Sequence, residues 1–225
     1  MDEQGRDGML TKNKTRLEEW EDVHKVVPWG SVPDRNFQKF IEWDGDCALR
    51  DTRTTFLDLG CGAGAQAIWL AEQGFKVYAV DGSAAAIKRL TERAARVTMR
   101  GELWPVVQDL TTIGANDWQD STFNCIFDMC CLQHMTEDEA VELVRKARRW
   151  LKPRGWFWSK QAIAPFDASL NRVSFIRTAT TESIRRMFMD SYAGGYVDVK
   201  LDMLREVVRG DKDLWSVIVL ARAGV

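Results

Sequence analysis

Short apolar segments alternate with longer helical segments along most of the chain from residue 55 onward. Five segments have the length and composition of buried strands: Thr55–Leu59, Lys76–Val80, Leu103–Val107, Cys125–Met129 and Gly155–Lys160. A regular alternation of strand and helix is typical of a parallel sheet covered by helices on both faces. The pattern therefore predicts an open α/β fold.

The helical segments between these strands carry their own start and stop signals. They are Ala63–Gln73, Ala84–Val97 and Glu137–Leu151. Ser83 can cap the second helix, and Thr136 with Glu139 can form the capping box of the third. Gly74 can end the first helix, because glycine readily adopts the left-handed conformation found there.

The C-terminal part of the chain changes to two strand-like segments. Tyr196–Met203 and Trp215–Leu220 are apolar or alternating, and they flank a turn at residues 209–212. Such a pair is typical of a β-hairpin. We therefore predict a doubly wound, Rossmann-like fold with a seven-stranded, mostly parallel sheet and an antiparallel strand in the C-terminal hairpin.

The N-terminal 50 residues have a helical pattern of their own. Four apolar residues fall on one face of a predicted first helix: Leu17, Trp20, Val23 and Val27. Prolines 28 and 33 interrupt this helix, and Phe37 lies in a second one. We expect residues 1–50 to form a helical cap within the same domain as residues 51–225, with residues 1–10 disordered.

Composition narrows the partners and the compartment. Lysine and arginine (31 residues) almost balance aspartate and glutamate (33 residues), so the net charge is −2 and no global field favours nucleic acid or an acidic membrane. The N-terminus lacks the apolar core of a signal peptide, and no segment approaches the roughly 18 to 20 apolar residues of a membrane span. Five cysteines without paired spacing fit a reducing compartment. We therefore expect a cytoplasmic protein.

The glycine-rich stretch FLDLGCGAGAQAIWLAEQGFKVYAVDGS, residues 56–83, carries the candidate chemistry. Asp81 follows Gly60 by 81 − 60 = 21 residues, near the spacing of about 20 at which a carboxylate accepts both hydroxyls of a ribose. A dinucleotide-binding turn would have a third glycine where Ala65 stands. Asp58 would repel a pyrophosphate, but it suits an ammonium or a sulfonium. S-adenosylmethionine has both of these groups and no phosphate.

Two segments, Leu57–Gly64 and Val77–Asp81, resemble the first two motifs of the class I S-adenosylmethionine-dependent methyltransferases. The resemblance continues through Gln108-Asp109-Leu110, Phe127-Asp128-Met129 and the segment Leu151–Gly155. It covers roughly residues 50 to 165 and implies an enzyme of the EC 2.1.1 class. S-adenosylmethionine would then be the cofactor and S-adenosylhomocysteine the product.

The resemblance also implies a set of cofactor-binding residues. Asp81 would hold the ribose, Asp109 the adenine amino group, and Asp58 the methionine end. Pro28-Trp29, followed by Pro33, is similar to the lead-in of thiopurine and thioether methyltransferases, where the tryptophan packs over the cofactor; a core tryptophan is the alternative for Trp29. The complete predicted set is Trp29, Asp58, Gly60, Cys61, Gly62, Asp81, Gly82, Gln108, Asp109, Leu110 and Met129.

The acceptor side offers one leading candidate for catalysis. His134 follows the fourth strand, where an open α/β sheet places its ligand crevice, so it is either a general base or a residue that lines the pocket. Gln133 and Arg177 are candidate substrate-binding residues. Adjacent Cys130 and Cys131 are interpreted as buried thiols, and no metal site is predicted.

We therefore predict an enzyme that transfers the methyl group of S-adenosylmethionine to a nitrogen, oxygen or sulfur atom of a small molecule by in-line displacement. The protein would be a monomer or a homodimer. Two alternatives stay open: a methyltransferase that acts on tRNA or a protein side chain, and a non-catalytic partner subunit that binds S-adenosylmethionine.

Overall fold

The computed structural model describes residues 14–27, 32–44, 47–164, 173, 175–190, 196–208 and 212–224. Three predictions lie outside these residues: the role of Trp29, the disorder of residues 1–10, and the turn at residues 209–211.

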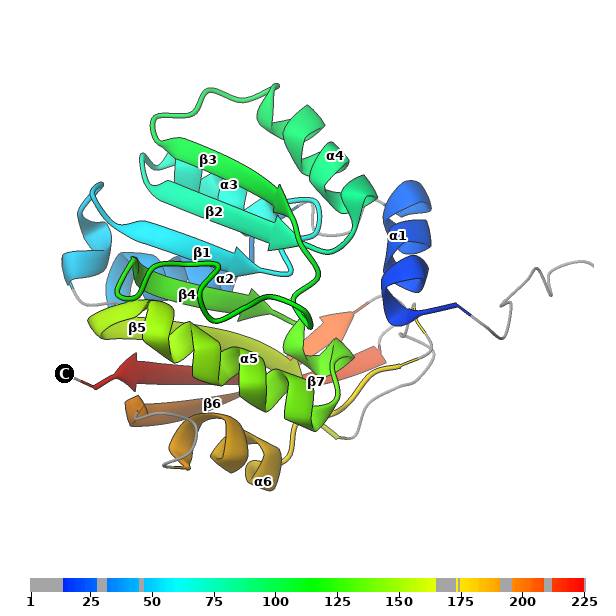
Figure 1. The fold of residues 1–225 in the computed structure, drawn as a ribbon, viewed down its shortest axis with the longest axis vertical. Coiled ribbons are helices and arrows are strands. Elements are labelled where there is room, and N and C mark those ends of the chain that lie inside the picture. The colour runs from blue at the N-terminus through cyan, green and yellow to red at the C-terminus, as the bar shows by residue number, and fades with distance from the viewer. Residues whose placement is uncertain are drawn as a thin grey trace, which may run out of the picture.

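Seven strands form one sheet in the order β3-β2-β1-β4-β5-β7-β6 (Figure 1). They are β1 Thr55–Leu59, β2 Lys76–Asp81, β3 Glu102–Val107, β4 Phe123–Met129, β5 Leu151–Ala162, β6 Tyr196–Val208 and β7 Lys212–Ala223. Strands β1 to β5 pair in parallel, and β7 is antiparallel to both β5 and β6. The predicted fold class is confirmed.

The helices and helical turns fill the connections. They are α1 Arg16–Val26, α2 Arg35–Lys39 with a π-helical turn Phe40–Asp44, a 3-10 turn Cys47–Arg50, α3 Ala65–Glu72, α4 Ala84–Ala94, a 3-10 turn Leu132–His134, α5 Glu137–Trp150, and α6 Thr181–Ile184 with a π-helical turn Arg185–Met189. The predicted caps are confirmed: the Ser83 side chain accepts a hydrogen bond from the amide of Ala86, and Thr136 with Glu139 forms the capping box of α5.

Two hydrophobic cores lie on opposite faces of the sheet. Trp150 of α5 and Phe157 of β5 are fully buried in the core under α5. Phe37 of α2 lies with Phe127 and Trp158 in the core under α2, α3 and α4. Figure 1 shows α5 in front of the sheet and α3 behind it, so the sheet is doubly wound. None of the helices in the described part of the chain is long and apolar enough to cross a membrane.

Strands β5, β6 and β7 are longer than predicted. Strand β5 begins at Leu151, directly after α5, because Leu151 pairs with Phe123 of β4. Residues 152–155 then lie in a register shift between Phe123 and Cys125. Within the described strands, residues 152–155 have no register partner on β4 or β7, and regular pairing resumes at Trp156.

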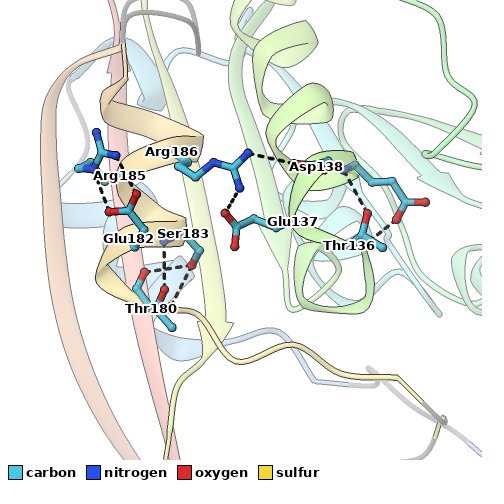
Figure 2. Close-up of polar contacts among 9 residues, drawn as sticks. Thr136, Glu137, Asp138, Thr180, Glu182, Ser183, Arg185 and Arg186 are labelled. Atoms are coloured by element: carbon cyan, nitrogen blue, oxygen red, sulfur yellow. Dashed lines mark hydrogen bonds and ion pairs between the residues drawn. The ribbon is translucent and has the colours of Figure 1, made fainter.

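A surface ion-pair cluster fixes the segment after β5 to the start of α5. Figure 2 shows Arg186 reaching from the π-helical turn to α5, where Nη2 lies 2.9 Å from Asp138 Oδ1 and Nη1 bonds Glu137. Thr180 caps α6 through the amide of Ser183. These bonds connect the helical segment after β5 to the start of α5.

Replacing Phe37 by alanine should lower the free energy of unfolding by about 3–5 kcal/mol, because a large buried side chain leaves a cavity. The Phe37 ring is fully buried, with its centroid 4.4 Å from that of Phe127 and 5.2 Å from that of Trp158. Urea unfolding measures the change. Arg35→Ala, at an exposed position of the same helix, should stay within about 0.5 kcal/mol of wild type, and equal stability of the two variants would contradict this account.

Candidate active site

The turn between β1 and α3 is bound tightly to two neighbouring segments. Gly60 has a φ of +72° and Gly62 a φ of +52°, which side chains rarely allow. The amides of Gly60 and Cys61 donate to the Val80 carbonyl at 2.8 and 3.0 Å. A Cβ on Gly60 would come within 2.5 Å of the Cys131 Cβ. The turn therefore needs glycine here, because the loop after β4 lies directly against it.

Asp81, at the end of β2, holds the other side of this turn. Its Oδ2 accepts the amide of Gly62 and its Oδ1 accepts the amide of Ser83, both at 2.8 Å. Burial raises the pKa of Asp81, although these bonds and nearby His24 act in the opposite direction. The carboxyl group predicted to bind ribose therefore also connects the glycine turn to the start of α4.

Asp58 and Asp128 lie on the neighbouring strands β1 and β4, and both are buried. Asp58 Oδ2 has no hydrogen-bond partner among the described residues. Burial raises the pKa of Asp58 well above its usual range, and Asp81 and Asp128 raise it further. Asp128 accepts bonds from the amides of Cys131 and Leu132 at 2.6 and 3.0 Å and from the Ser159 hydroxyl at 2.7 Å. Two buried carboxyl groups and the half-buried Asp81 at one edge of the sheet favour positive charge nearby, such as that of an ammonium or sulfonium group.

Helix α1 lies across the carboxyl ends of the strands (Figure 1). At α4, Glu21 Oε2 accepts the Ser83 hydroxyl at 2.6 Å and the Ala85 amide at 3.0 Å. At α5, Arg16 donates to the His134 carbonyl at 3.0 Å and pairs with Glu139 at 2.6 Å. The helix therefore bridges the starts of α4 and α5 across the carboxyl edge of the sheet.

His24 of α1 is a site residue that the sequence did not reveal. Its side chain is 3% exposed, and its Nδ1 has no partner among the described residues. Its Cε1 would lie 3.4 Å from a Cβ on Gly62, so the ring stands over the glycine turn. Burial lowers the pKa of His24, while Asp81 raises it. The sequence offered one signal for His24: it follows Trp20 by four residues, so the two side chains lie on the same face of the helix.

The contacts of His134 fix which of its ring nitrogens carries the hydrogen. Its Nδ1 lies 3.0 Å from the Phe175 carbonyl, which requires Nδ1 to carry the hydrogen. Nε2 is then the acceptor, with the side-chain amide of Gln133 at 3.4 Å. Burial lowers the pKa of His134, so the neutral imidazole predominates at neutral pH. Trp20 packs edge-on against this ring at 4.7 Å between centroids.

Gln133 and Arg177 make mainly structural contacts. Gln133 Oε1 accepts the Ala162 amide at 2.8 Å. Arg177 Nη2 lies 3.2 Å from the Leu132 carbonyl and 3.4 Å from Gln161 Oε1. Its Nε and Nη1 have no partner in the described part of the chain. Both residues hold the 3-10 turn against β5, and their contact with an acceptor stays a prediction.

The other predicted cofactor residues are distributed around the same edge. The Gln108 amide donates to the Asp81 carbonyl at 2.9 Å, and Gly82 lies beneath Leu17 of α1. Asp109 Oδ1 accepts the amide and hydroxyl of Thr111 at 2.9 and 2.8 Å. Leu110 and Met129 are mainly packing residues: the first is buried in the core under α5, and the second packs against the opposite core.

The buried thiols at this edge are not activated. Burial raises the pKa of Cys61 and Cys131 well above its usual range, and the nearby aspartates add to this effect. Both therefore stay protonated at neutral pH, and a thiolate nucleophile is not formed here.

A glycine turn after β1, an acid at the end of β2 and a further buried acid on β1 define a Rossmann-like site for an adenosine ligand that carries positive charge. Residues 56–155 match the family model of a methyltransferase domain. Residues 56–155 are therefore assigned to a class I S-adenosylmethionine-dependent methyltransferase domain, and S-adenosylmethionine is the cofactor of such domains.

Relatives of known sequence and structure agree with this assignment. The chain is 32% identical over 121 residues to the cypemycin N-terminal methyltransferase of a Streptomyces species, covering 51% of this chain and 44% of that protein. It is 30% identical over 109 residues to the ribosomal RNA small subunit methyltransferase C of Alcanivorax borkumensis, covering 45% and 30%. The chain thus spans less than half the length of these two curated relatives.

Among solved structures, the fold is similar to that of the N-methyltransferase NodS from Bradyrhizobium japonicum WM9 in complex with S-adenosylhomocysteine. The TM-score is 0.65 at 15% identity, and the match covers 93% of this chain and 99% of that one. At this identity the similarity shows the fold.

The pKa of Asp128 leads to a prediction about stability. Burial raises it to about 6 from 3.8, so the folded protein keeps a proton that the unfolded chain loses. The resulting contribution to the free energy of unfolding is complete below pH 3.8 and is lost as the pH rises through about 6.

Asp128→Asn stays neutral and keeps an acceptor for the two backbone amides. Its stability relative to wild type should therefore increase by up to about 3 kcal/mol between acidic and neutral pH. Urea unfolding of both proteins across this range measures the difference, with Glu92→Gln on the exposed face of α4 as control. A pH-independent difference for Asp128→Asn would contradict the raised pKa.

Proposed function

We propose that the protein transfers the methyl group of S-adenosylmethionine to a nitrogen, oxygen or sulfur atom of a small-molecule acceptor. The observation that carries this proposal is the neutral His134 at the acid-lined edge of the sheet, whose unprotonated Nε2 accepts only a long hydrogen bond from Gln133 in the described residues and could take a proton in its place.

The chain offers a complementary group for each part of the cofactor. Asp81 would accept the ribose hydroxyls, and Asp109 the adenine amino group. Asp58, with its unpartnered buried oxygen, would face the ammonium of the methionine end. The bound cofactor supplies a methyl carbon that is already activated by positively charged sulfur. Gly60 and Gly62 allow the backbone to approach the ligand closely.

His24 adds a polar atom from the α1 side. Its unpartnered Nδ1 stands over Gly62 and beside Asp81. An unpaired buried nitrogen is costly, and a hydrogen bond to the cofactor would remove this cost. Binding of the cofactor and docking of α1 would then support each other.

The transfer needs alignment, exclusion of water and removal of one proton from an amine, hydroxyl or thiol acceptor. A lone pair of the acceptor forms the new bond to the methyl carbon while the sulfur–carbon bond pair returns to sulfur. His134 Nε2 takes the acceptor proton and later releases it to solvent. Helix α1 keeps water out of the crevice.

A small acceptor is favoured because Trp20 and Arg16 of α1 pack against the loop that carries His134. The near-balanced charge of the chain offers no general attraction to RNA. The cypemycin relative acts, by its name, at an N-terminus, which is also a single amine. Cys61, Cys125, Cys130 and Cys131 form no disulfide among the described residues, which supports a cytoplasmic location.

Asp81→Asn should weaken binding of S-adenosylhomocysteine about tenfold or more, since a hydrogen bond to a charged group contributes about 1.5–3 kcal/mol. The asparagine keeps only one of the two oxygens that accept the Gly62 and Ser83 amides, so the melting temperature should also fall. The titration is therefore made at a temperature at which circular dichroism shows the variant to be folded. Calorimetric titration measures the affinity, with Glu92→Gln as the surface control. Unchanged affinity would remove Asp81 from the cofactor site.

The proposed reaction is tested by supplying methyl-labelled S-adenosylmethionine with separate panels of small amines, thiols and phenols, of peptides with free N-termini, and of bulk RNA. Label in a small molecule is expected. Label confined to RNA or to large polypeptides would overturn the small-molecule assignment, and cofactor binding without any transfer would indicate a non-catalytic subunit.

With the acceptor so identified, His134→Gln should lower kcat about 10²- to 10⁴-fold. Because the pKa of His134 is lowered from its usual value of 6.5, wild-type kcat/KM should fall only below pH 6.5, where the base becomes protonated. This acid limb should be absent in the variant, whose affinity for S-adenosylhomocysteine should be unchanged. An equal acid limb in both enzymes would assign His134 to lining the pocket.

A further inference from the structure

The outer edge of β6 is a candidate interaction surface. Strand β6 ends the sheet on one side, and β3 ends it on the other. Strand β3 has 6 residues and contains Pro105, which cannot donate a hydrogen bond. Strand β6 has 13 residues without proline, and it is paired on one side only, with β7, within the described residues. Long edges of this kind readily pair with another strand.

The two faces of this edge strand carry different side chains. Leu201 and Met203 lie opposite Val219 and Val217 of β7, so they face the α5 side of the sheet. They are nevertheless 49% and 60% exposed. Lys200 and Asp202 lie on the other face, are exposed, and have no ion-pair partner within the described residues.

A bulge limits where a second strand could pair. The register with β7 shifts between Val197 and Lys200, and Asp198 there has a φ of +56°. Bulges disturb pairing and bend the edge. The stretch that follows the bulge, from Lys200 to Arg205, pairs regularly with β7. A pairing centred on Leu201 therefore rests on residues 200–202, and Met203 would face Val199 at the end of the bulge.

The sequence of this stretch is complementary to itself when it is reversed. Around Leu201, the residues on either side are Lys200 and Asp202, and beyond them Val199 and Met203. An antiparallel second copy centred on Leu201 would place each Lys200 opposite an Asp202, and each Met203 opposite a Val199. Opposite charges and apolar pairs on directly facing positions are the combinations that stabilise a sheet.

We propose that two copies of this chain associate through β6, antiparallel about a two-fold axis at Leu201, so that their sheets join into one. A two-fold contact uses the same patch on both subunits, as this self-complementary pattern requires. On the apolar face of the strand, each Leu201 then packs beside the Leu201 of the second copy, and each Met203 packs beside its Val199. The joint lies along the side of the sheet, away from the carboxyl edge that holds His134 and Asp81, and it is independent of the proposed reaction.

The test exploits the charge pairing. Sedimentation of the wild-type chain over a wide range of concentration should show a dimer. Lys200→Asp alone brings four acids together at the joint, and Asp202→Lys alone brings four lysines together, so each variant should be monomeric. An equimolar mixture of the two variants restores both charge pairs and should form a heterodimer. The double variant Lys200→Asp/Asp202→Lys should again form a homodimer.

Lys88→Asp, an equal charge reversal on the exposed face of α4, should leave the dimer unchanged. Circular dichroism and affinity for S-adenosylhomocysteine confirm that the single variants are folded. A wild-type chain that is monomeric at every concentration would overturn the proposal. A dimer that survives both single reversals, or a mixture of the variants that stays monomeric, would overturn it as well.

Discussion

The structure depends on the burial of carboxyl groups at the edge where the parallel strands end. Asp58, Asp81 and Asp128 come from three different strands, and burial raises the pKa of each. Asp81 and Asp128 are compensated by amides and a hydroxyl, and these bonds shape the turns around them. Asp58 keeps an oxygen that has no partner among the residues the structure describes. The fold thus tolerates an unfavourable group at the one place where a cationic ligand would make it favourable.

The surrounding elements are arranged around this edge. The glycine turn lies so close to Cys131 that the loops after β1 and β4 form one packed unit. Glu21 and Arg16 of α1 join the starts of α4 and α5. Arg186 in turn joins α5 to the segment that follows β5. Together these contacts hold the segments that carry His134 and Asp81 in place at the carboxyl edge of the sheet.

Most of the fold, and the position of the glycine turn and Asp81 at one edge of the sheet, could be predicted from the sequence because they depend on local signals. The glycines, the acid after β2 and the caps Ser83 and Thr136 each act through neighbours in the chain. The role of His24 could not be read in this way, since it depends on where α1 docks. The engagement of Gln133 with the Ala162 amide was also hidden, because β4 and β5 pair only in the folded sheet. The extended ends of β5 to β7 likewise come from pairing rather than from composition.

Helix α1 completes the site with little apolar anchoring. Of its eleven residues only His24 is buried, and the bonds from Arg16 and Glu21 lie where water competes for them. The wall of the cofactor site is therefore among the less stable parts of the chain, while its floor lies in the core. If the cofactor binds as proposed, we expect its release to depend on how often this single helix detaches, so that the residence time of the product would be a property of α1 more than of the glycine turn.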